Sequence, residues 1–214
     1  MKAHSGWNGF RRNRALPLRV MRLGLVLIAA TVSSAVHAQS PSEQMHLHLD
    51  PAATEIHYTL KATMHSVKGN FRLKSGEVTV DTKTGAVQGK IEVDLTSGTS
   101  GNDSRDDRMK REILETDKFP LATFEVEKSA GFNTAAASQT ISVDGVFTLH
   151  GSPHPMTMQI MLARDAGSDH GVTATTSFKI PYIAWGIKDP SIPFVHVDKE
   201  VTVEITAKGT LQAQ

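Results

Sequence analysis

Apolar and polar residues alternate with a period of two along most of this chain, and this pattern constrains its fold most strongly. The segment TEIHYTLKA places Ile56, Tyr58 and Leu60 on one side and His57 and Thr59 on the other. Successive side chains of a β-strand point to opposite faces, so such segments predict strands with one buried face. The same alternation recurs in MHLHLD, GEVTVD, KIEVDL, LATFEVEK, ISVDGVFTLHG, MTMQIMLA, GVTATTSFKI and VTVEITAKG.

The number and spacing of these segments predict an all-β, antiparallel fold. About eight or nine strands are indicated, and most are joined by short turns such as TKTG, where Gly85 suits a left-handed conformation. Strands that bury only one face are typical of antiparallel sheets. A sheet of about eight strands closes into a barrel, which leaves no unpaired edge. A two-sheet sandwich is the alternative.

Two segments interrupt the alternation. In SGNDSRDDRMKREILETDKFP, the spacing of Met109, Ile113 and Leu114 on one helical face predicts one short helix over residues 104–115. Polar residues before it can cap its first turn. The tract SAGFNTAAASQT, residues 129–140, predicts a long, mobile hairpin loop.

The first 38 residues have the composition of an export signal. They hold six basic residues and no acid, then an apolar run over residues 23–35 that ends at VHAQ, where Val36 and Ala38 are the small residues before a cleavage site. The run is too short for a stable membrane span. A compact signal also begins at Met21, which could be the true start. We therefore expect a signal peptide over residues 1–38 and one exported domain over residues 39–214.

Without the signal the chain is acidic and free of cysteine. Six of the 23 basic residues lie in residues 1–38, so residues 39–214 hold 17 basic against 22 acidic residues, a net charge of −5. This balance argues against nucleic-acid binding. No cysteine is present, so disulfides and thiolate chemistry are excluded. No second apolar run of membrane length occurs, and we expect a soluble domain rather than an integral membrane protein.

The predicted inward face is apolar and offers few groups for chemistry. Valine, isoleucine, leucine and alanine dominate it, and Met156, Met158 and Met161 fall on one strand. Methionine adapts to irregular apolar shapes. A filled core and an apolar tunnel that holds a lipid chain are both compatible with this pattern, and an eight-stranded barrel is wide enough for either.

Several stretches, in order, resemble the YceI-like family of exported lipid-binding proteins. They are HSVKGNF, LTSGTSGNDSRDDRMKREILETDKFPLATFEV, VDGVFTLHGSPHPMTMQI and IPYIAWGIKDPS followed by VDKEVTVEITAKGTL. The resemblance implies a lipocalin-like antiparallel barrel in the periplasm. It also implies a polyisoprenoid or fatty-acid-like lipid as ligand, and neither a cofactor nor a catalytic group. Whether the protein forms a homodimer stays open.

The helix departs from the common pattern of that family. Ile113 and Leu114 stand where an aromatic pair is frequent, and Arg108 and Met109 replace a histidine-leucine pair. These differences bear on ligand length and head group. We take the following residues as candidates for the tunnel or its mouth: Tyr58, Leu60, His65, Phe71, Arg105, Met109, Leu114, Phe124, Phe147, His150, Met156, Met158, Phe178 and Trp185.

Three of these candidates have a structural alternative. His65 and His150 could donate to a ligand head group, but we favour a hydrogen bond from each to a nearby backbone carbonyl. Arg105 could bind a diphosphate or carboxylate in a bidentate manner. We favour the reading in which Arg105 and Asp106 clamp the start of the helix to a strand.

Two other functions are weighed against lipid binding: a metal-binding or stress-protective module that uses surface histidines, and a lipid hydrolase. His46 and His48 share one strand face, and His57 is the nearest candidate for a third zinc ligand. The His46 and His48 side chains are expected to face solvent, and nothing fixes His57 near them. We therefore predict no metal site. A lipid hydrolase would need a serine–histidine or acid–histidine contact at the barrel mouth. The stretch TSGTSGN does not fit the Gly-x-Ser-x-Gly pattern, and we predict no enzyme activity.

Overall fold

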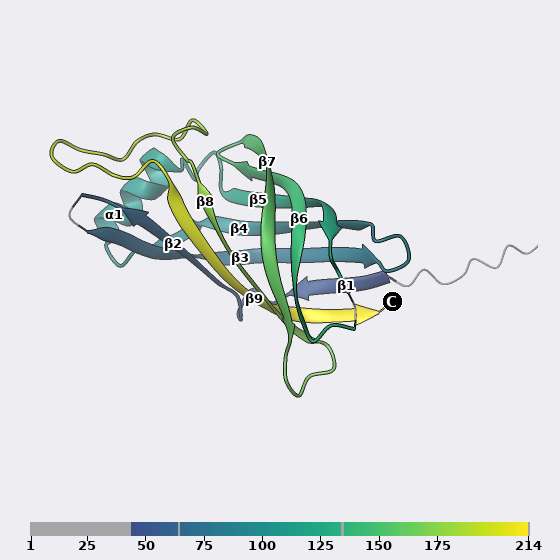
Figure 1. Cartoon of the computed structure of the whole chain (residues 1–214). Coiled ribbons are helices and arrows are strands. Elements are labelled where there is room, and N and C mark those ends of the chain that lie inside the picture. The colour runs from purple at the N-terminus through teal and green to yellow at the C-terminus, as the bar shows by residue number, and fades with distance from the viewer. Residues whose placement is uncertain (1–43, 64, 134, 214) are drawn as a thin grey trace, which may run out of the picture. The chain divides into compact units, whose positions relative to one another are not determined.

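A computed structural model describes residues 44–63, 65–133 and 135–213 of the chain. Nine strands within these residues form one antiparallel sheet (Figure 1). The export signal expected over residues 1–38 and the alternative start at Met21 lie outside the described residues. The strands are β1 Gln44–Leu49, β2 Glu55–Lys61, β3 Ser66–Asp81, β4 Val87–Thr99, β5 Leu121–Ala130, β6 Ser138–Leu149, β7 Ser152–Arg164, β8 Gly171–Ile180 and β9 Val201–Ala213.

The sheet closes into a barrel with eight strand positions. Strands β1 and β2 each pair with β3 on one side and β9 on the other, so they occupy one position in series. Leu47 faces Val78 and Leu211, for example. The remaining strands follow in sequence order from β3 to β9. The predicted antiparallel barrel is therefore confirmed, and the sandwich is not formed.

Alternation along the strands sets which side chains fill the barrel. In β6, Ile141, Val143, Phe147 and Leu149 are buried, whereas Asp144 is exposed. The same pattern in the other strands builds a large apolar cluster and a smaller one around Leu49, Ile56 and Leu73. Because every inward position points to one shared interior, local sequence determines most of the core.

Strand β3 contains two irregularities in its pairing with β4. Its register with β4 shifts between Asn70 and Arg72 and again between Leu73 and Ser75. Such bulges increase the local twist of a strand and bend it. The bend lets one strand pair with β2 in its first half and with β1 in its second half.

The predicted helix is present but changes its winding midway. Helix α1, Asp103–Arg108, is capped by Asn102, whose side chain accepts a hydrogen bond from Arg105 N at 3.0 Å. The next residues, Met109–Ile113, form a π-helical turn, η1, in which Leu114 N donates to Met109 O at 2.8 Å. One continuous α-helix was expected. The wider turn instead accompanies burial of Ile113 against the barrel.

A glycine lets the helix pack closely on the barrel. A Cβ atom at Gly98 would lie 2.5 Å from the ring of Phe71 and 2.7 Å from the methyl carbon of Met109. The hydroxyl of Tyr58 donates to Met109 Sδ at 3.4 Å. These contacts hold the helical segment against the end of the barrel where β4 leaves and β5 begins.

The two ends of the barrel differ in character. One end carries α1, η1, the β2–β3 turn, the β6–β7 turn and the β8–β9 loop, and we call it the helix end. We call the hairpin end the one that carries the β3–β4, β5–β6 and β7–β8 connections. Figure 1 shows the helical segment and the long β8–β9 loop at one side of the barrel.

Candidate ligand-binding cavity

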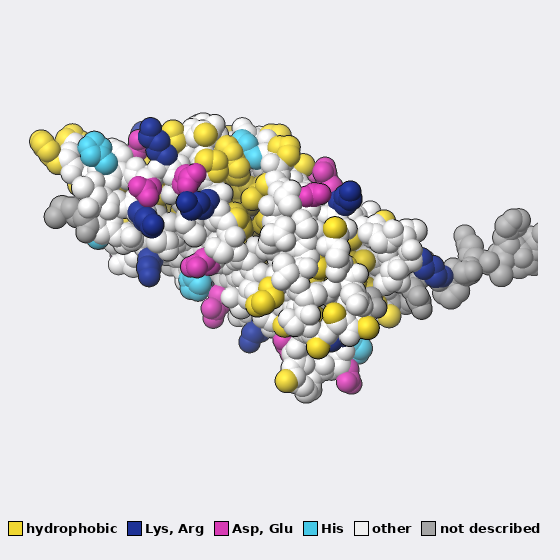
Figure 2. Space-filling view, in the orientation of Figure 1, with side chains coloured by type: hydrophobic (Ala, Val, Ile, Leu, Met, Phe, Trp, Pro, Cys, Tyr) yellow, Lys and Arg dark blue, Asp and Glu magenta, His cyan; other side chains and the backbone are white. Residues whose placement is uncertain are grey.

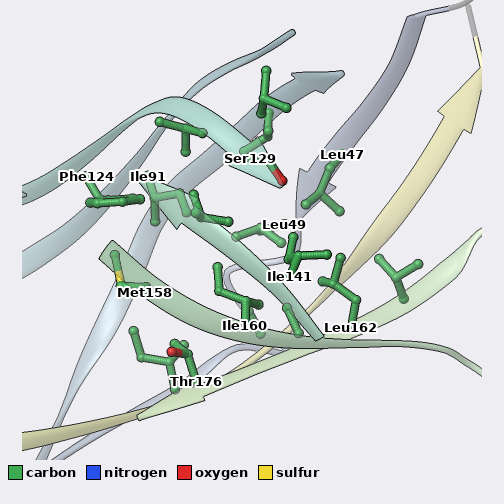
Figure 3. Close-up of a pocket in the computed structure, with 18 of the residues that line it drawn as sticks. Leu47, Leu49, Ile91, Phe124, Ser129, Ile141, Met158, Ile160, Leu162 and Thr176 are labelled. Atoms are coloured by element: carbon green, nitrogen blue, oxygen red, sulfur yellow. The ribbon is translucent and has the colours of Figure 1, made fainter. Parts of the chain in front are cut away.

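An apolar cavity of about 170 Å³ lies inside the barrel. All nine strands contribute inward-facing side chains to its walls, and Figure 3 shows many of them converging on one space. The cavity exists because these side chains, mostly branched aliphatics, do not meet at the barrel axis. One from each strand is Leu47, Ile56, Leu73, Ile91, Phe124, Ile141, Ile160, Ala174 and Ile205.

The cavity reaches the surface at the β5–β6 connection. Its lining includes Phe132, Ala136 and the exposed residue Asn133. The side chain of Gln139 accepts a hydrogen bond from Asn133 N at 2.7 Å and donates one to Asn133 O at 2.8 Å. The loop expected over residues 129–140 is shorter, because β5 runs to Ala130 and β6 begins at Ser138, and the connection between them forms the rim of the cavity. Its sequence carried no signal for that role.

Aromatic side chains fill the barrel toward the helix end. The ring of Phe147 lies 6.1 Å from that of Phe178 and 5.9 Å from that of Trp185, centroid to centroid. The indole of Trp185 stacks on the imidazole of His154 at 3.9 Å and 3°. Phe147 and Phe178 also belong to the cavity wall. The interior is thus hollow on one side of these two rings and packed on the other.

Two hydroxyl groups in the cavity wall have no hydrogen-bond partner among the described residues. They are Thr54 Oγ1 and Ser129 Oγ, and both atoms are buried. Figure 3 shows the Ser129 hydroxyl turned into the pocket on the side of Leu47. The hydroxyl of Thr176, by contrast, donates to Gln159 O at 2.8 Å. A buried hydroxyl without a partner is unfavourable, so these two atoms are suited to a polar group on a ligand.

The candidate residues from the sequence divide between the cavity and its surroundings. Four of them line the cavity, namely Phe124, Phe147, Met158 and Phe178. His65 is exposed at the β2–β3 turn. Five others pack against the large core cluster without lining the cavity: Leu60, Phe71, Leu114, Met156 and Trp185. The alternation identified inward positions, but it did not show which of them border empty space.

Arg105 and Asp106 hold the start of α1 to the end of β4. Arg105 donates from Nε to Ser100 Oγ at 2.7 Å and from Nη2 to the Ser100 carbonyl at 2.9 Å. The buried carboxylate of Asp106 accepts hydrogen bonds from the Ser100 N–H and hydroxyl and from Thr99 Oγ1. Neither residue lines the cavity. These contacts are those of a clamp on the helix.

The pKa of Asp106 reflects this clamp. Burial acts to raise the pKa, but the hydrogen bonds from Ser100 and Thr99 and the charge of Arg105 outweigh it. The net result is a pKa below the ordinary value, so the carboxylate is ionised near neutral pH. An ionised, hydrogen-bonded Asp106 is therefore part of the folded structure.

His150 pairs with an acid rather than with a backbone carbonyl. Its Nε2 lies 2.9 Å from Glu115 Oε2, and its ring is 4.5 Å from that of Phe119. Glu115 also receives a hydrogen bond from Lys118. The contact with Lys118, and to a smaller extent the contact with His150, lowers the pKa of Glu115. Two further candidates, Tyr58 and Met109, contact each other at the helix end and do not line the cavity. The acid–histidine pair ties the end of η1 to the β6–β7 turn and does not line the cavity.

The outward-facing histidines do not converge. His48 bonds Glu77, and His57 lies 3.5 Å from Glu55. Across the residues with described positions, no group of three or more histidine, cysteine or acidic side chains is arranged to hold a metal ion. No helix among the described residues is long and apolar enough to cross a bilayer.

A closed antiparallel barrel around an apolar cavity, with a short helix at one end, defines a lipocalin-like barrel protein. The chain belongs to the YceI-like family, because the model of the YceI-like domain matches residues 47–209. The expected membership is therefore confirmed.

Solved structures with the same fold come from several bacteria. A polyisoprenoid binding domain from Saccharophagus degradans matches with a TM-score of 0.58 and 18% identity, covering 78% of this chain and 98% of that chain. BcnA of Burkholderia cenocepacia matches with a TM-score of 0.60 and 18% identity, covering 75% and 98%. The YCEI protein of Campylobacter jejuni matches with a TM-score of 0.54 and 15% identity, covering 69% and 86%. A search among curated proteins finds no match.

Proposed function

We propose that this protein binds a long apolar or amphiphilic chain, such as a polyisoprenoid or a fatty-acid-like lipid, inside its barrel. The observation that carries the proposal is the apolar cavity that reaches the surface beside Asn133. Membership of the YceI-like family supports it, as does the similarity to a domain described as polyisoprenoid binding. Binding of this kind needs neither a cofactor nor a catalytic group, and we propose a carrier or reservoir rather than an enzyme.

The size of the cavity bears on how a long chain is held. An apolar cavity of about 150 Å³ is known to hold one benzene molecule, so the cavity of about 170 Å³ accommodates roughly six carbon atoms without rearrangement. A longer chain must displace wall side chains, of which Met158 is the most adaptable. Each buried methylene contributes about 0.8 kcal/mol, so a dozen groups supply on the order of 10 kcal/mol against that displacement and the ordering of the chain.

The unpartnered hydroxyls refine the class of ligand. Thr54 Oγ1 and Ser129 Oγ can each donate one hydrogen bond into an otherwise apolar space. A pure hydrocarbon would leave both unsatisfied. A chain with a neutral hydrogen-bond acceptor, such as an alcohol, ester or carbonyl oxygen, would satisfy at least one of them. We therefore propose an amphiphile over a hydrocarbon.

The proposed location follows from the N-terminal sequence. Basic residues followed by a short apolar run support export, and we propose that residues 39–214 act as a soluble carrier in the periplasm. A chain that is insoluble in water needs such a carrier to cross an aqueous compartment. Light scattering of the purified domain would decide between a monomer and a homodimer.

Ligand recovery and a blocked cavity together test the proposal. Protein purified from its own host is analysed by native mass spectrometry, followed by organic extraction. In parallel, uptake of a fluorescent fatty acid and of farnesol is measured for three proteins: wild type, Ala174→Phe and Thr175→Phe. Ala174 lines the cavity, whereas the adjacent Thr175 lies opposite the outward-facing Met161.

We expect a co-purified amphiphile, uptake by wild type and by Thr175→Phe, and loss of uptake in Ala174→Phe. Far-UV circular dichroism confirms that both variants keep the barrel. Repeated recovery of empty wild-type protein that takes up neither probe would overturn the proposal. So would equal uptake by wild type and Ala174→Phe.

A further inference from the structure

The outermost part of the β8–β9 loop, residues 181–200, is a tight turn. An unusual residue occupies the tip of this turn. Ile192 and Val195 form an antiparallel bridge, with Ile192 N donating to Val195 O at 3.1 Å and Val195 N donating to Ile192 O at 3.0 Å. Pro193 and Phe194 are the two central residues. Figure 1 shows this loop projecting away from the barrel at the helix end.

Phe194 is exposed and conformationally strained at the same time. Its side chain is 94% exposed, and its φ angle is 72°. A turn with proline first and a left-handed residue second normally has glycine in the second position, and a bulky residue there is disfavoured. Ile192 beside it is 49% exposed. The fold therefore presents a large aromatic side chain to solvent where glycine would be easier to accommodate.

The tip also lacks charged side chains. Residues 190–197, PSIPFVHV, contain no aspartate, glutamate, lysine or arginine, and their nearest charged neighbours are Asp189 and Asp198. The β2–β3 turn is bonded to this loop, since Thr63 N donates to His196 O at 3.0 Å. Figure 2 shows hydrophobic side chains at the outer extremity of the loop and charged side chains set back from it.

The size and shape of this tip distinguish between partners. An exposed phenylalanine offers roughly 150–250 Å², and half an isoleucine adds less than that. A stable protein interface needs about 800 Å² from each partner, so the tip is too small for one. A bilayer surface requires only a few apolar or aromatic side chains that reach below the head groups, with the polar remainder in water.

We propose that the turn Ile192–Val195 inserts Phe194 and Ile192 into the surface of a lipid bilayer. The inference rests on the proposed function, because a carrier of water-insoluble chains works beside the membranes that supply and receive them. The tip stands at the helix end, while the cavity opens beside the β5–β6 connection, so docking and ligand uptake use different parts of the barrel.

Vesicle binding by matched variants tests this inference. The full domain, residues 39–214, is mixed with vesicles of phosphatidylethanolamine and phosphatidylglycerol, and the bound fraction is measured by flotation. Phe194→Gly removes the aromatic ring and suits the positive φ angle, so the variant keeps its fold. Met161→Ser removes the third large exposed apolar side chain of the described residues, which lies on β7 outside the loop.

We expect wild type and Met161→Ser to bind equally and Phe194→Gly to bind roughly tenfold more weakly or worse. Absence of vesicle binding by wild type overturns the inference, as does equal binding by Phe194→Gly. A self-association of wild type that Phe194→Gly abolishes would assign the tip to a second copy and equally overturn it. Farnesol uptake separates the two proposals, because it reports on the cavity and not on the tip. Uptake by Phe194→Gly should stay at the wild-type level whether or not the tip docks on a bilayer.

Discussion

The side-chain amide of Gln139 bonds both the N–H and the carbonyl of Asn133, at 2.7 and 2.8 Å. This pairing fixes the β5–β6 connection as the rim of the cavity. Because the Asn133 backbone borders the opening, Gln139 is placed to govern how quickly a ligand enters and leaves.

Gln139→Ala should therefore speed ligand exchange more than it weakens the fold. The two hydrogen bonds contribute about 0.5–1.5 kcal/mol each, and we expect a several-fold faster release of a bound fluorescent fatty acid in stopped-flow measurements. Gln159→Ala is the control, since this exposed glutamine bonds Ser142 across β6 and β7 away from the rim. Equal release rates for wild type and Gln139→Ala would contradict the assignment.

Thr54→Val should stabilise the empty protein. Thr54 is 9% exposed and its hydroxyl has no hydrogen-bond partner among the described residues, so valine removes an unsatisfied group of similar volume. We expect the free energy of unfolding in urea to rise by about 1–3 kcal/mol with an unchanged m-value. The same variant should lose affinity for farnesol while it keeps affinity for a hydrocarbon of equal length. A less stable variant would show that the hydroxyl is satisfied.

Stability should fall in acid through Asp106. Its folded-state pKa lies below the ordinary value, so the ionised carboxylate stabilises the fold above the unfolded-state pKa, and this contribution is lost as the pH drops through the folded-state pKa. Asp106→Asn should cost about 1.5–3 kcal/mol at pH 7, because hydrogen bonds to a charged group are lost. The difference in free energy of unfolding between wild type and Asp106→Asn should shrink below about pH 4. Urea unfolding at pH 7 and pH 3 measures both values.

The two tyrosines of the chain should resist ionisation. Burial raises the pKa of Tyr182 to about 12, together with the charges of Asp189 and Asp198, and burial raises that of Tyr58 with help from Asp106. A raised pKa means stability that is present below about pH 10 and lost as the pH rises toward the folded-state value. Absorbance at 295 nm should therefore show less tyrosinate near pH 10 in the folded protein than in the unfolded chain. The unfolded chain in guanidinium is the control, and equal titrations would refute the expectation.

The helical segment shows where sequence reasoning reaches its limit. The spacing of Met109, Ile113 and Leu114 indicated a helix over residues 104–115, and a helix begins at Asp103. The change to a π-helical turn at Met109 was not predicted, since it accompanies contacts with Tyr58 and with the surface around Gly98. Tyr58 and the Phe71 ring beside Gly98 lie far from Met109 in the chain, and no local pattern contains them.

The sequence by itself determined the class of fold, because an alternation of period two is a local property that each strand carries independently of its neighbours. It also indicated the family through the order of its motifs. Only the tertiary structure decided that the interior stays open beside Ser129 and Phe132 and is packed around Phe147 and Trp185. The reason is geometric: a cavity is the volume left over when side chains from nine strands and a loop fail to meet, and that volume depends on registers and bends that couple distant residues.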